Sequence, residues 1–168
     1  MFKATKTIYL MSKKYSKKTQ REHVLLRPDT YVGDIEPTKE TMWVKSATTD
    51  NLEKREIYYV PGFYKIFDEI LVNARDACIN DKTADSINVE INQEEGYISV
   101  LNNGDNGIPI IQHEEHKSLI PSMIFGEMLT SSNYDDDEKR ITGGRNGYGA
   151  KLTNIFSTKF EVTVVDKK

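Results

Sequence analysis

The fold of this chain is decided by the stretch Thr142-Gly143-Gly144-Arg145-Asn146-Gly147-Tyr148-Gly149-Ala150-Lys151. Four of its glycines fall within seven residues, and apolar residues at helical spacing follow at once. Glycine has no Cβ, so backbone N–H groups can approach a ligand closely, and a helix start adds unpaired N–H groups that suit a phosphate. The spacing matches neither the Walker loop nor the dinucleotide-binding fingerprint. Taken alone, the stretch therefore predicts either an anion-binding loop or a flexible surface loop.

Length and composition predict one domain with one sizeable core, because the chain has 168 residues of which 38% are hydrophobic. The net charge of -3 argues neither for nor against a nucleic-acid partner. Residues 1–21 are nevertheless an arm whose charged residues are all basic, and it could contact DNA, contact a partner subunit or remain a solvated tail. Cys78 is the single cysteine, which excludes an internal disulfide. Since Cys78 falls on an apolar helical face, we expect it in the core.

The strongest helix is predicted from Phe63 to about Ile79. Its apolar positions repeat with helical spacing, and they are Phe63, Ile66, Phe67, Ile70, Leu71, Ala74 and Cys78. Glu69, Asn73 and Asp76 form a narrow polar face beside this stripe. That face is either the ordinary polar flank of an amphipathic helix or the wall of a pocket, and the spacing alone favours the flank.

Shorter elements are predicted along the rest of the chain. The expected strands are Met42–Val44, Ile57–Val60, Ile87–Ile91, Tyr97–Leu101 and Lys159–Val165. Ser46–Glu56 would connect the first two strands, and Asn102–Pro109 would be a polar loop at a strand end. Further helices are expected at Thr19–Leu26, from Leu119 to about Leu129, and after the glycines, with a turn at Arg27–Gly33.

Two polar segments invite a functional interpretation. His113 and His116 are three residues apart, whereas the zinc helix needs a spacing of four, so we expect them to be surface residues. The segment Asp135–Arg140 precedes the glycine stretch, and a loop of this length is typical of a lid or of an unstructured connection.

The order of these pieces resembles the GHKL ATPases. A helix with Glu-x-x-x-Asn comes first, a loop with Asn-Gly-x-x-Gly follows, and a lid ends in a glycine-rich helix start. The wording of several segments is similar to one branch, eukaryotic-type DNA topoisomerase II. These segments are Lys17–Gln20, His23–Tyr31, Phe67–Ala74, Leu129–Glu138 and Gly143–Lys151. The resemblance extends from about Tyr15 to Val165.

The resemblance implies an α+β fold of the Bergerat type, an α/β sandwich whose mixed, mostly antiparallel sheet is covered on one face by helices. Residues 1–21 would be the basic arm and residues 22–168 the ATPase domain. The family's transducer domain and DNA-cleavage core have no counterpart here, so the domain is expected to be incomplete at its C-terminal end. We expect either a fragment of a longer enzyme or an unusually short one.

The resemblance also implies a site for ATP and Mg²⁺. Glu69 matches the general base that activates water, Asn73 matches the Mg²⁺ ligand, and Asn102 matches a position near the adenine. Tyr15 matches an arm residue that crosses to the partner subunit's nucleotide. The positions matching contacts to the ribose and phosphates are Ser131, Ser132, Asn133, Gly144, Arg145, Asn146, Gly147, Tyr148, Gly149, Ala150 and Lys151.

Two departures from the family pattern affect this site. The family usually has Asn-Asn-Gly-x-Gly-Ile-Pro, whereas Asn102–Pro109 carries one extra residue, which would shift Gly107 and the floor of the adenine pocket. Ala77 stands where the eukaryotic enzymes tend to have an asparagine, which would remove one nucleotide contact.

The activity implied is that of an ATP-dependent dimer gate for DNA strand passage. DNA would be a partner of the full-length enzyme, and ATP binding would form the homodimer. Because the transducer lysine is missing, we expect this chain alone to hydrolyse ATP poorly and to be unable to cleave DNA. Two alternatives are a non-catalytic nucleotide-binding or dimerisation module and another GHKL ATPase. An intracellular location is expected, nuclear in a eukaryotic cell, and a viral origin also fits.

Overall fold

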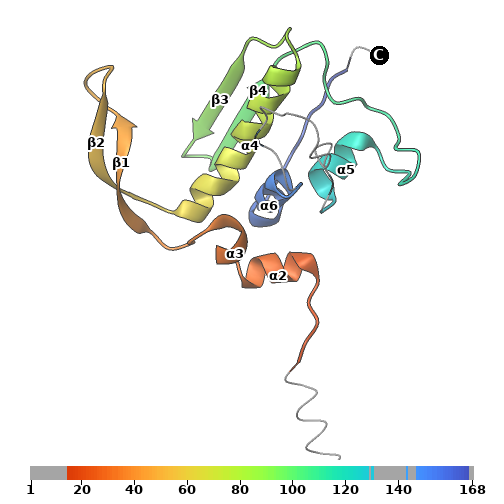
Figure 1. Ribbon diagram of the computed structural model, residues 1–168, viewed down its shortest axis with the longest axis horizontal. Helices are drawn as coiled ribbons and strands as arrows, with labels where there is room; N and C mark the ends of the chain where they lie inside the picture. The colour runs from red at the N-terminus through yellow and green to blue at the C-terminus, as the bar shows by residue number, and fades with distance from the viewer. Residues whose placement is uncertain (1–14, 129, 131–142, 144–146, 167–168) are drawn as a thin grey trace, which may run out of the picture.

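The computed structural model describes residues 15–128, 130, 143 and 147–166 (Figure 1). Its helices and strands mix along the chain, which confirms the α+β class. The elements are α2 (Gln20–Leu26), α3 (Asp29–Val32), β1 (Thr38–Lys45), β2 (Leu52–Tyr59), α4 (Pro61–Asn80), β3 (Ile87–Asn92), β4 (Tyr97–Asn102), α5 (Ile120–Gly126) and α6 (Gly149–Phe156). No described helix is long and apolar enough to cross a membrane.

The first helix begins where its capping residues predict. The Thr19 hydroxyl accepts the Glu22 amide at 3.2 Å, and the Glu22 carboxylate accepts the Thr19 amide at 2.8 Å. The turn predicted at Arg27–Gly33 is wrong in part, because Asp29–Val32 forms the short helix α3. Its N-cap, Pro28, has φ −59° and ψ −37°, already helical, and its carbonyl accepts the amides of the third and fourth residues that follow.

The long helix α4 confirms the strongest helix prediction and starts two residues earlier, at Pro61. Proline suits this position because its missing N–H would have no partner in the first turn. The apolar stripe is not buried throughout: Ala74 is 6% exposed, whereas Phe63 is 59% exposed. The helix ends at Asn80, and the amide of its C-cap residue, Asp81, donates to the Ala77 carbonyl.

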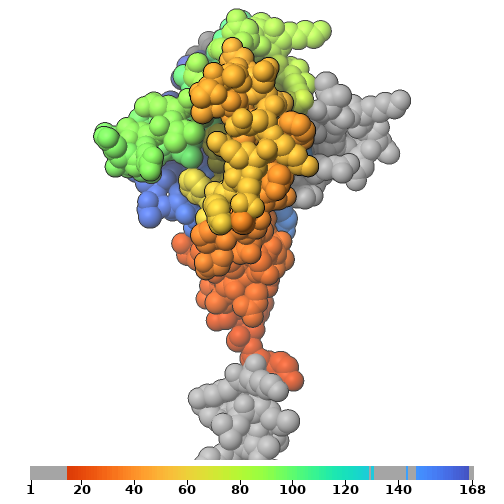
Figure 2. Space-filling model, turned by 90° about the vertical axis from the view of Figure 1, so that its left-hand side faces the viewer, coloured from red at the N-terminus to blue at the C-terminus, as the bar shows by residue number. Residues whose placement is uncertain are grey.

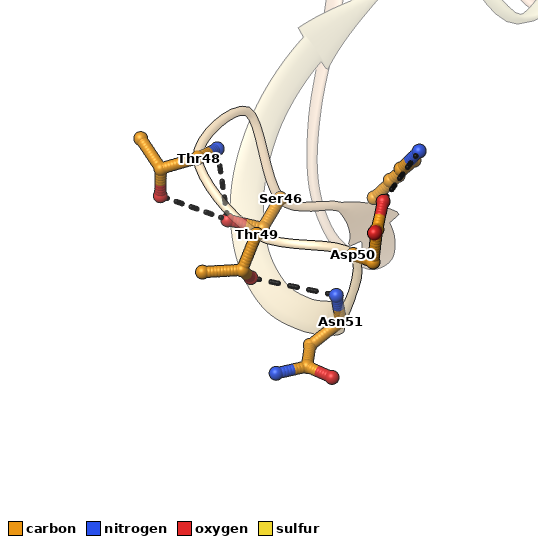
Figure 3. Close-up of polar contacts among 6 residues, drawn as sticks. Ser46, Thr48, Thr49, Asp50 and Asn51 are labelled. Atoms are coloured by element: carbon orange, nitrogen blue, oxygen red, sulfur yellow. Dashed lines mark hydrogen bonds and ion pairs between the residues drawn. The ribbon is translucent and has the colours of Figure 1, made fainter.

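The strands form two separate antiparallel hairpins. In the first, β1 pairs with β2 from Thr38 opposite Tyr59 to Lys45 opposite Leu52. Both predicted strands exist, but each has eight residues, and the connection is Ser46–Asn51 rather than Ser46–Glu56. Figure 3 shows this connection, which local hydrogen bonds hold: the Ser46 hydroxyl accepts the Thr48 amide at 3.4 Å. The polar part of β2 carries no alternating apolar pattern because the hairpin is open to solvent (Figure 2).

The second hairpin supports the long helix. β3 pairs with β4 from Ile87 opposite Asn102 to Asn92 opposite Tyr97, which confirms both predicted strands. Ile98 and Val100 are half-buried and alternate with exposed residues of β4, and α4 packs on this strand (Figure 1). The described strands thus form two two-stranded sheets rather than one mixed sheet.

Two predicted elements need correction. The helix predicted to reach about Leu129 ends at Gly126, and the Thr130 hydroxyl donates to the carbonyls of Met123 and Glu127 beyond its last turn. The strand predicted at Lys159–Val165 is absent from the described part of the chain. These residues have no strand ladder beside them there, and a strand needs a partner for its backbone groups.

The core is small and lies where α2, α3 and α6 meet. Val24, Val32 and Leu152 are buried at its centre, with exposed fractions of 0%, 6% and 4%. Half-buried side chains complete it: Tyr31, Ile66, Met128, Tyr148, Ile155 and Phe156. The core therefore fixes α6 against α4.

Candidate active site

The candidate site lies where α6 begins beside the polar face of α4. Gly149, the first residue of α6, packs directly against the Glu69 side chain. A Cβ at Gly149 would lie 3.0 Å from Glu69 Cδ and 3.2 Å from its Cβ, and Glu69 Oε2 would be the atom nearest to it. Glycine is therefore required there by close approach, and the glycine stretch and the long helix share one wall.

Lys65 holds the other oxygen of the Glu69 carboxylate. Lys65 Nζ lies 2.5 Å from Glu69 Oε1, one helical turn away, and the Glu69 side chain is 23% exposed. The hydrogen bond to Glu69 is the main cause that raises the pKa of Lys65. Glu69 is thus oriented with Oε1 toward Lys65 and Oε2 toward the start of α6. Lys65 is not among the residues predicted from the sequence, although its i, i+4 spacing to Glu69 is a signal for the pair.

Asp76 anchors the beginning of the glycine stretch. Its two carboxylate oxygens accept the Gly143 amide at 3.0 and 2.9 Å, and Asp76 is 8% exposed. A Cβ at Gly143 would lie 2.8 Å from Val72 Cγ1, so the backbone runs close to α4. The polar face of α4 therefore contacts the glycine stretch, through Glu69 at Gly149 and through Asp76 at Gly143, and its role as the wall of a pocket stays a prediction.

Lys151 is a buried cation on α6. Its exposed fraction is 4%, and its Nζ donates to the Thr130 carbonyl at 2.7 Å. Burial lowers the pKa of Lys151. Within the described residues no carboxylate pairs with it. Because buried charges normally carry a partner of opposite sign, this ammonium group suits an anion, and none of the described residues supplies one.

The remaining expected ligands are placed less directly. Asn73 is half-buried on α4 one turn after Glu69, and its side chain has no hydrogen bond within the described residues. Asn102 ends β4 on the same face as Ile98 and Val100, which is the face that packs toward α4. The Asn102 side chain is exposed and donates to the Asn103 carbonyl at 3.3 Å.

The structure brings some predicted residues together and leaves others untested. Gly147, Tyr148, Gly149 and Ala150 lead into or begin α6, and the Tyr148 ring contacts the Tyr31 ring at 6.3 Å between centroids. Tyr15 is 80% exposed. Six predicted contacts lie outside the described residues: Ser131, Ser132, Asn133, Gly144, Arg145 and Asn146.

The histidines do not form a metal centre. The rings of His113 and His116 lie 4.7 Å apart, and His113 Nδ1 accepts the amides of Glu115 and His116. Among the described residues, no group of three or more His, Cys, Asp or Glu side chains could hold a metal ion.

Comparison with known proteins shows clear relatives. No protein-family model matches the chain. It is 56% identical over 154 residues to DNA topoisomerase 2 of Drosophila melanogaster, an alignment covering 92% of this chain and 11% of that protein. It is 57% identical over 154 residues to human DNA topoisomerase 2-beta, covering 92% of this chain and 9% of that protein.

A solved structure extends the likeness to the fold. The crystal structure of the ATPase region of Saccharomyces cerevisiae topoisomerase II matches with a TM-score of 0.83 at 54% identity, covering 88% of this chain and 39% of that chain. This chain spans about a tenth of the length of the curated relatives it matches, 11% and 9% in the two cases. On this evidence the chain is homologous to eukaryotic DNA topoisomerase 2 over most of its own length and has the fold of the ATPase region of topoisomerase II.

Proposed function

We propose that this chain binds ATP with Mg²⁺ and hydrolyses it as the ATPase part of a type II DNA topoisomerase. One observation carries the proposal: a buried ammonium group without a described counter-charge, Lys151, lies two residues after the Gly149 contact with Glu69. A triphosphate would supply the missing negative charge, and the start of α6 would add backbone N–H donors. A carboxylate at the same wall supplies a base.

Hydrolysis would proceed by attack of water on the γ-phosphorus. Glu69 Oε2, which faces the start of α6, would take a proton from the water as its oxygen forms the new bond to phosphorus. The bond between the γ-phosphorus and the β-bridging oxygen breaks, and ADP leaves with the electron pair. Lys65 would keep the carboxylate in this orientation, and Lys151 would offset charge on the phosphates.

Asn73 is the residue that would hold Mg²⁺. A carboxamide oxygen is a hard ligand, and Mg²⁺ usually keeps waters and phosphate oxygens in its other positions, so the absence of an acidic cage among the described residues fits this ion. When bound, the ion would offset charge on the β- and γ-phosphates. Asn102 would contact the adenine, and Ser131, Ser132, Asn133 and residues 144–151 would enclose the ribose and phosphates.

The wider role follows the relatives. The relatives are DNA topoisomerases, and we propose that this chain contributes an ATP-driven dimer gate to such an enzyme, with Tyr15 reaching the partner's nucleotide. DNA would be a partner of the complete enzyme. The protein would act inside the cell, in the nucleus of a eukaryote or at the genome of a virus.

Titration calorimetry with a non-hydrolysable ATP analogue, with and without Mg²⁺, tests binding, and phosphate release tests turnover. Glu69→Gln should bind the analogue like wild type and lose turnover, because the amide keeps the shape of the group but is not a base. Asp68→Asn is the matched control, since Asp68 is the adjacent carboxylate of α4 and lies 3.8 Å from the same Lys65. It should leave both readouts nearly unchanged.

The same data separate the alternatives. Absence of binding at millimolar analogue would refute the ATPase proposal and favour a dimerisation module. Binding with no phosphate release from wild type under single-turnover conditions would leave a non-catalytic nucleotide-binding module. An equal loss of phosphate release in Glu69→Gln and Asp68→Asn would refute the assignment of Glu69 as the general base.

A further inference from the structure

The loop that follows β4 bends over the end of α4. Its segment Gly104-Asp105-Asn106 contains the residue that the family pattern lacks. Gly104 has φ +137°, and a Cβ there would lie 2.5 Å from Asp81 Oδ2 and 3.2 Å from Ala84 Cβ. No L side chain fits this backbone conformation or this space, so the loop runs directly over the Asp81 carboxylate.

Asp81 satisfies the donors that the longer loop brings. Its carboxylate accepts the Asn106 amide at 2.7 Å and the Asn106 side-chain Nδ2 at 3.0 Å. It also accepts the Thr83 hydroxyl at 2.7 Å and the Thr83 amide at 3.0 Å. Four donors thus converge on this carboxylate, three of them on Oδ1 and one on Oδ2, as suits an ionised acceptor. These bonds, led by that of the Thr83 hydroxyl, hold the pKa of Asp81 far below its usual range, and the residue is 5% exposed.

Two neighbouring contacts complete the attachment. The Asp105 amide donates to the Thr83 hydroxyl oxygen at 2.8 Å, and the same hydroxyl donates to Asp81. Thr83 therefore links the loop to the Asp81 carboxylate. On the other side, Asn103 Oδ1 accepts the amides of Asp85 and Ser86, each at 3.0 Å. The segment after α4 and the segment after β4 therefore hold each other from both sides. Meanwhile Asn102 keeps its ladder position opposite Ile87.

We infer that Asp81, acting with Thr83, is a positioning residue for the base-binding end of the nucleotide site. Asp81 binds the segment Gly104–Asn106, which contains the extra residue, so that Asn102 keeps its pairing with Ile87 at the end of β4. This inference rests on the proposed function, because it assumes that Asn102 contacts the adenine. Asp81 does not touch nucleotide itself. Its effect on binding passes through the loop, and it should be confined to the base.

The test compares two ligands that share phosphates but differ in the base. Calorimetry on the full 168-residue chain measures the affinity for a non-hydrolysable ATP analogue with Mg²⁺ and for inorganic tripolyphosphate with Mg²⁺. Asp81→Asn should weaken the ATP analogue about tenfold, the usual scale for a lost hydrogen bond to a charged group, and leave tripolyphosphate within about twofold. Thr83→Val removes only the hydroxyl that links Asp105 to Asp81, so it should weaken the affinity for the ATP analogue less than Asp81→Asn does and leave the affinity for tripolyphosphate unchanged.

Asp50→Asn is the matched control. It makes the same substitution at the tip of the first hairpin, where the Asp50 side chain is 101% exposed and pairs with Lys45 at 3.2 Å (Figure 3). It should change neither affinity. Equal losses for both ligands in Asp81→Asn would overturn the inference, because the substitution would then damage the whole site. Unchanged ATP affinity in Asp81→Asn and Thr83→Val would overturn it as well.

The outcome for wild type separates this inference from the function on which it rests. If wild type binds the ATP analogue and the two variants do so equally well, the inference alone is wrong. If wild type binds no ATP analogue, the proposed function fails, and the inference fails with it. Thr83→Val keeps the test valid if Asp81→Asn does not fold.

Discussion

The contact between Gly149 and Glu69 makes a sharp prediction for the substitution Gly149→Ala. The added methyl group would overlap Glu69 Oε2 and would lie 3.0 Å from Glu69 Cδ, which is closer than the usual separation of about 3.5 to 4.0 Å between carbon atoms. Glu69 must turn away to admit it. Turning would break the 2.5 Å pair with Lys65 and remove Oε2 from the start of α6.

The expected magnitudes differ for stability and for activity. Overpacking costs about 1 to 3 kcal/mol, and the better helix propensity of alanine recovers about 1 kcal/mol, so the free energy of unfolding should fall by roughly 0 to 2 kcal/mol. For a domain of this size, this shifts the Tm by at most about 8 °C. Turnover should fall about 100-fold, because displacing a catalytic group by about 1 Å is enough for such a loss.

Single-turnover phosphate release and thermal unfolding measure the two effects side by side. Gly126→Ala is the matched control, because a Cβ at Gly126, the last residue of α5, would meet nothing within 4 Å. It should leave turnover unchanged. Wild-type turnover in Gly149→Ala would refute the assignment of Glu69 as a base oriented by this contact. A Tm loss much larger than that expected would place the defect in the core.

Three further substitutions test other parts of the structure. Burial lowers the pKa of Lys151, so the unfolded chain holds this proton more tightly, and the free energy of unfolding should rise as the pH approaches 10.5. Lys151→Met should flatten this rise, as measured by urea unfolding at a series of pH values. The same dependence on pH in wild type and variant would contradict the burial of Lys151 as a titrating group. Thr19→Ala removes the helix cap and should cost about 1 kcal/mol by urea unfolding, whereas no loss would mean that α2 needs no cap. Leu152→Ala, at 4% exposure, should cost about 2 to 5 kcal/mol, whereas Leu101→Ala, at 65% exposure, should stay within about 0.5 kcal/mol, and similar losses would misplace the core.

Elements with a buried face were predictable from the sequence. The period of α4 and the alternation of β3 and β4 arise because each has one face packed and one face open. The β1–β2 hairpin has no buried face of this kind, so only its apolar ends were recognised and its length was underestimated. The predicted strand at Lys159–Val165 alternates in sequence but has no ladder partner among the described residues, and pattern alone cannot supply one.

The site was predictable as types of residue and not as contacts. Glu69 and the glycine stretch were each predicted from their similarity to sequence motifs of the family, but their contact through Gly149 depends on how α6 packs against α4. Asp81 was missed because it lies in a polar connection where a single aspartate is unremarkable, and its partner besides Thr83, Asn106, is 25 residues away in sequence. Such long-range hydrogen bonds leave no periodic signal.

The open β1–β2 hairpin determines what the tryptophan fluorescence of this protein measures in solution. Trp43 is the single tryptophan of the chain, and it is 67% exposed on β1, opposite Lys54. Its indole already lies in water in the folded state, so tryptophan emission should be red-shifted, readily quenched by iodide, and nearly silent when the core around Val24 and Leu152 melts. Tryptophan emission that stays unchanged on heating would then report only the solvent exposure of Trp43 in the hairpin, whereas circular dichroism at the same temperatures records the loss of α4.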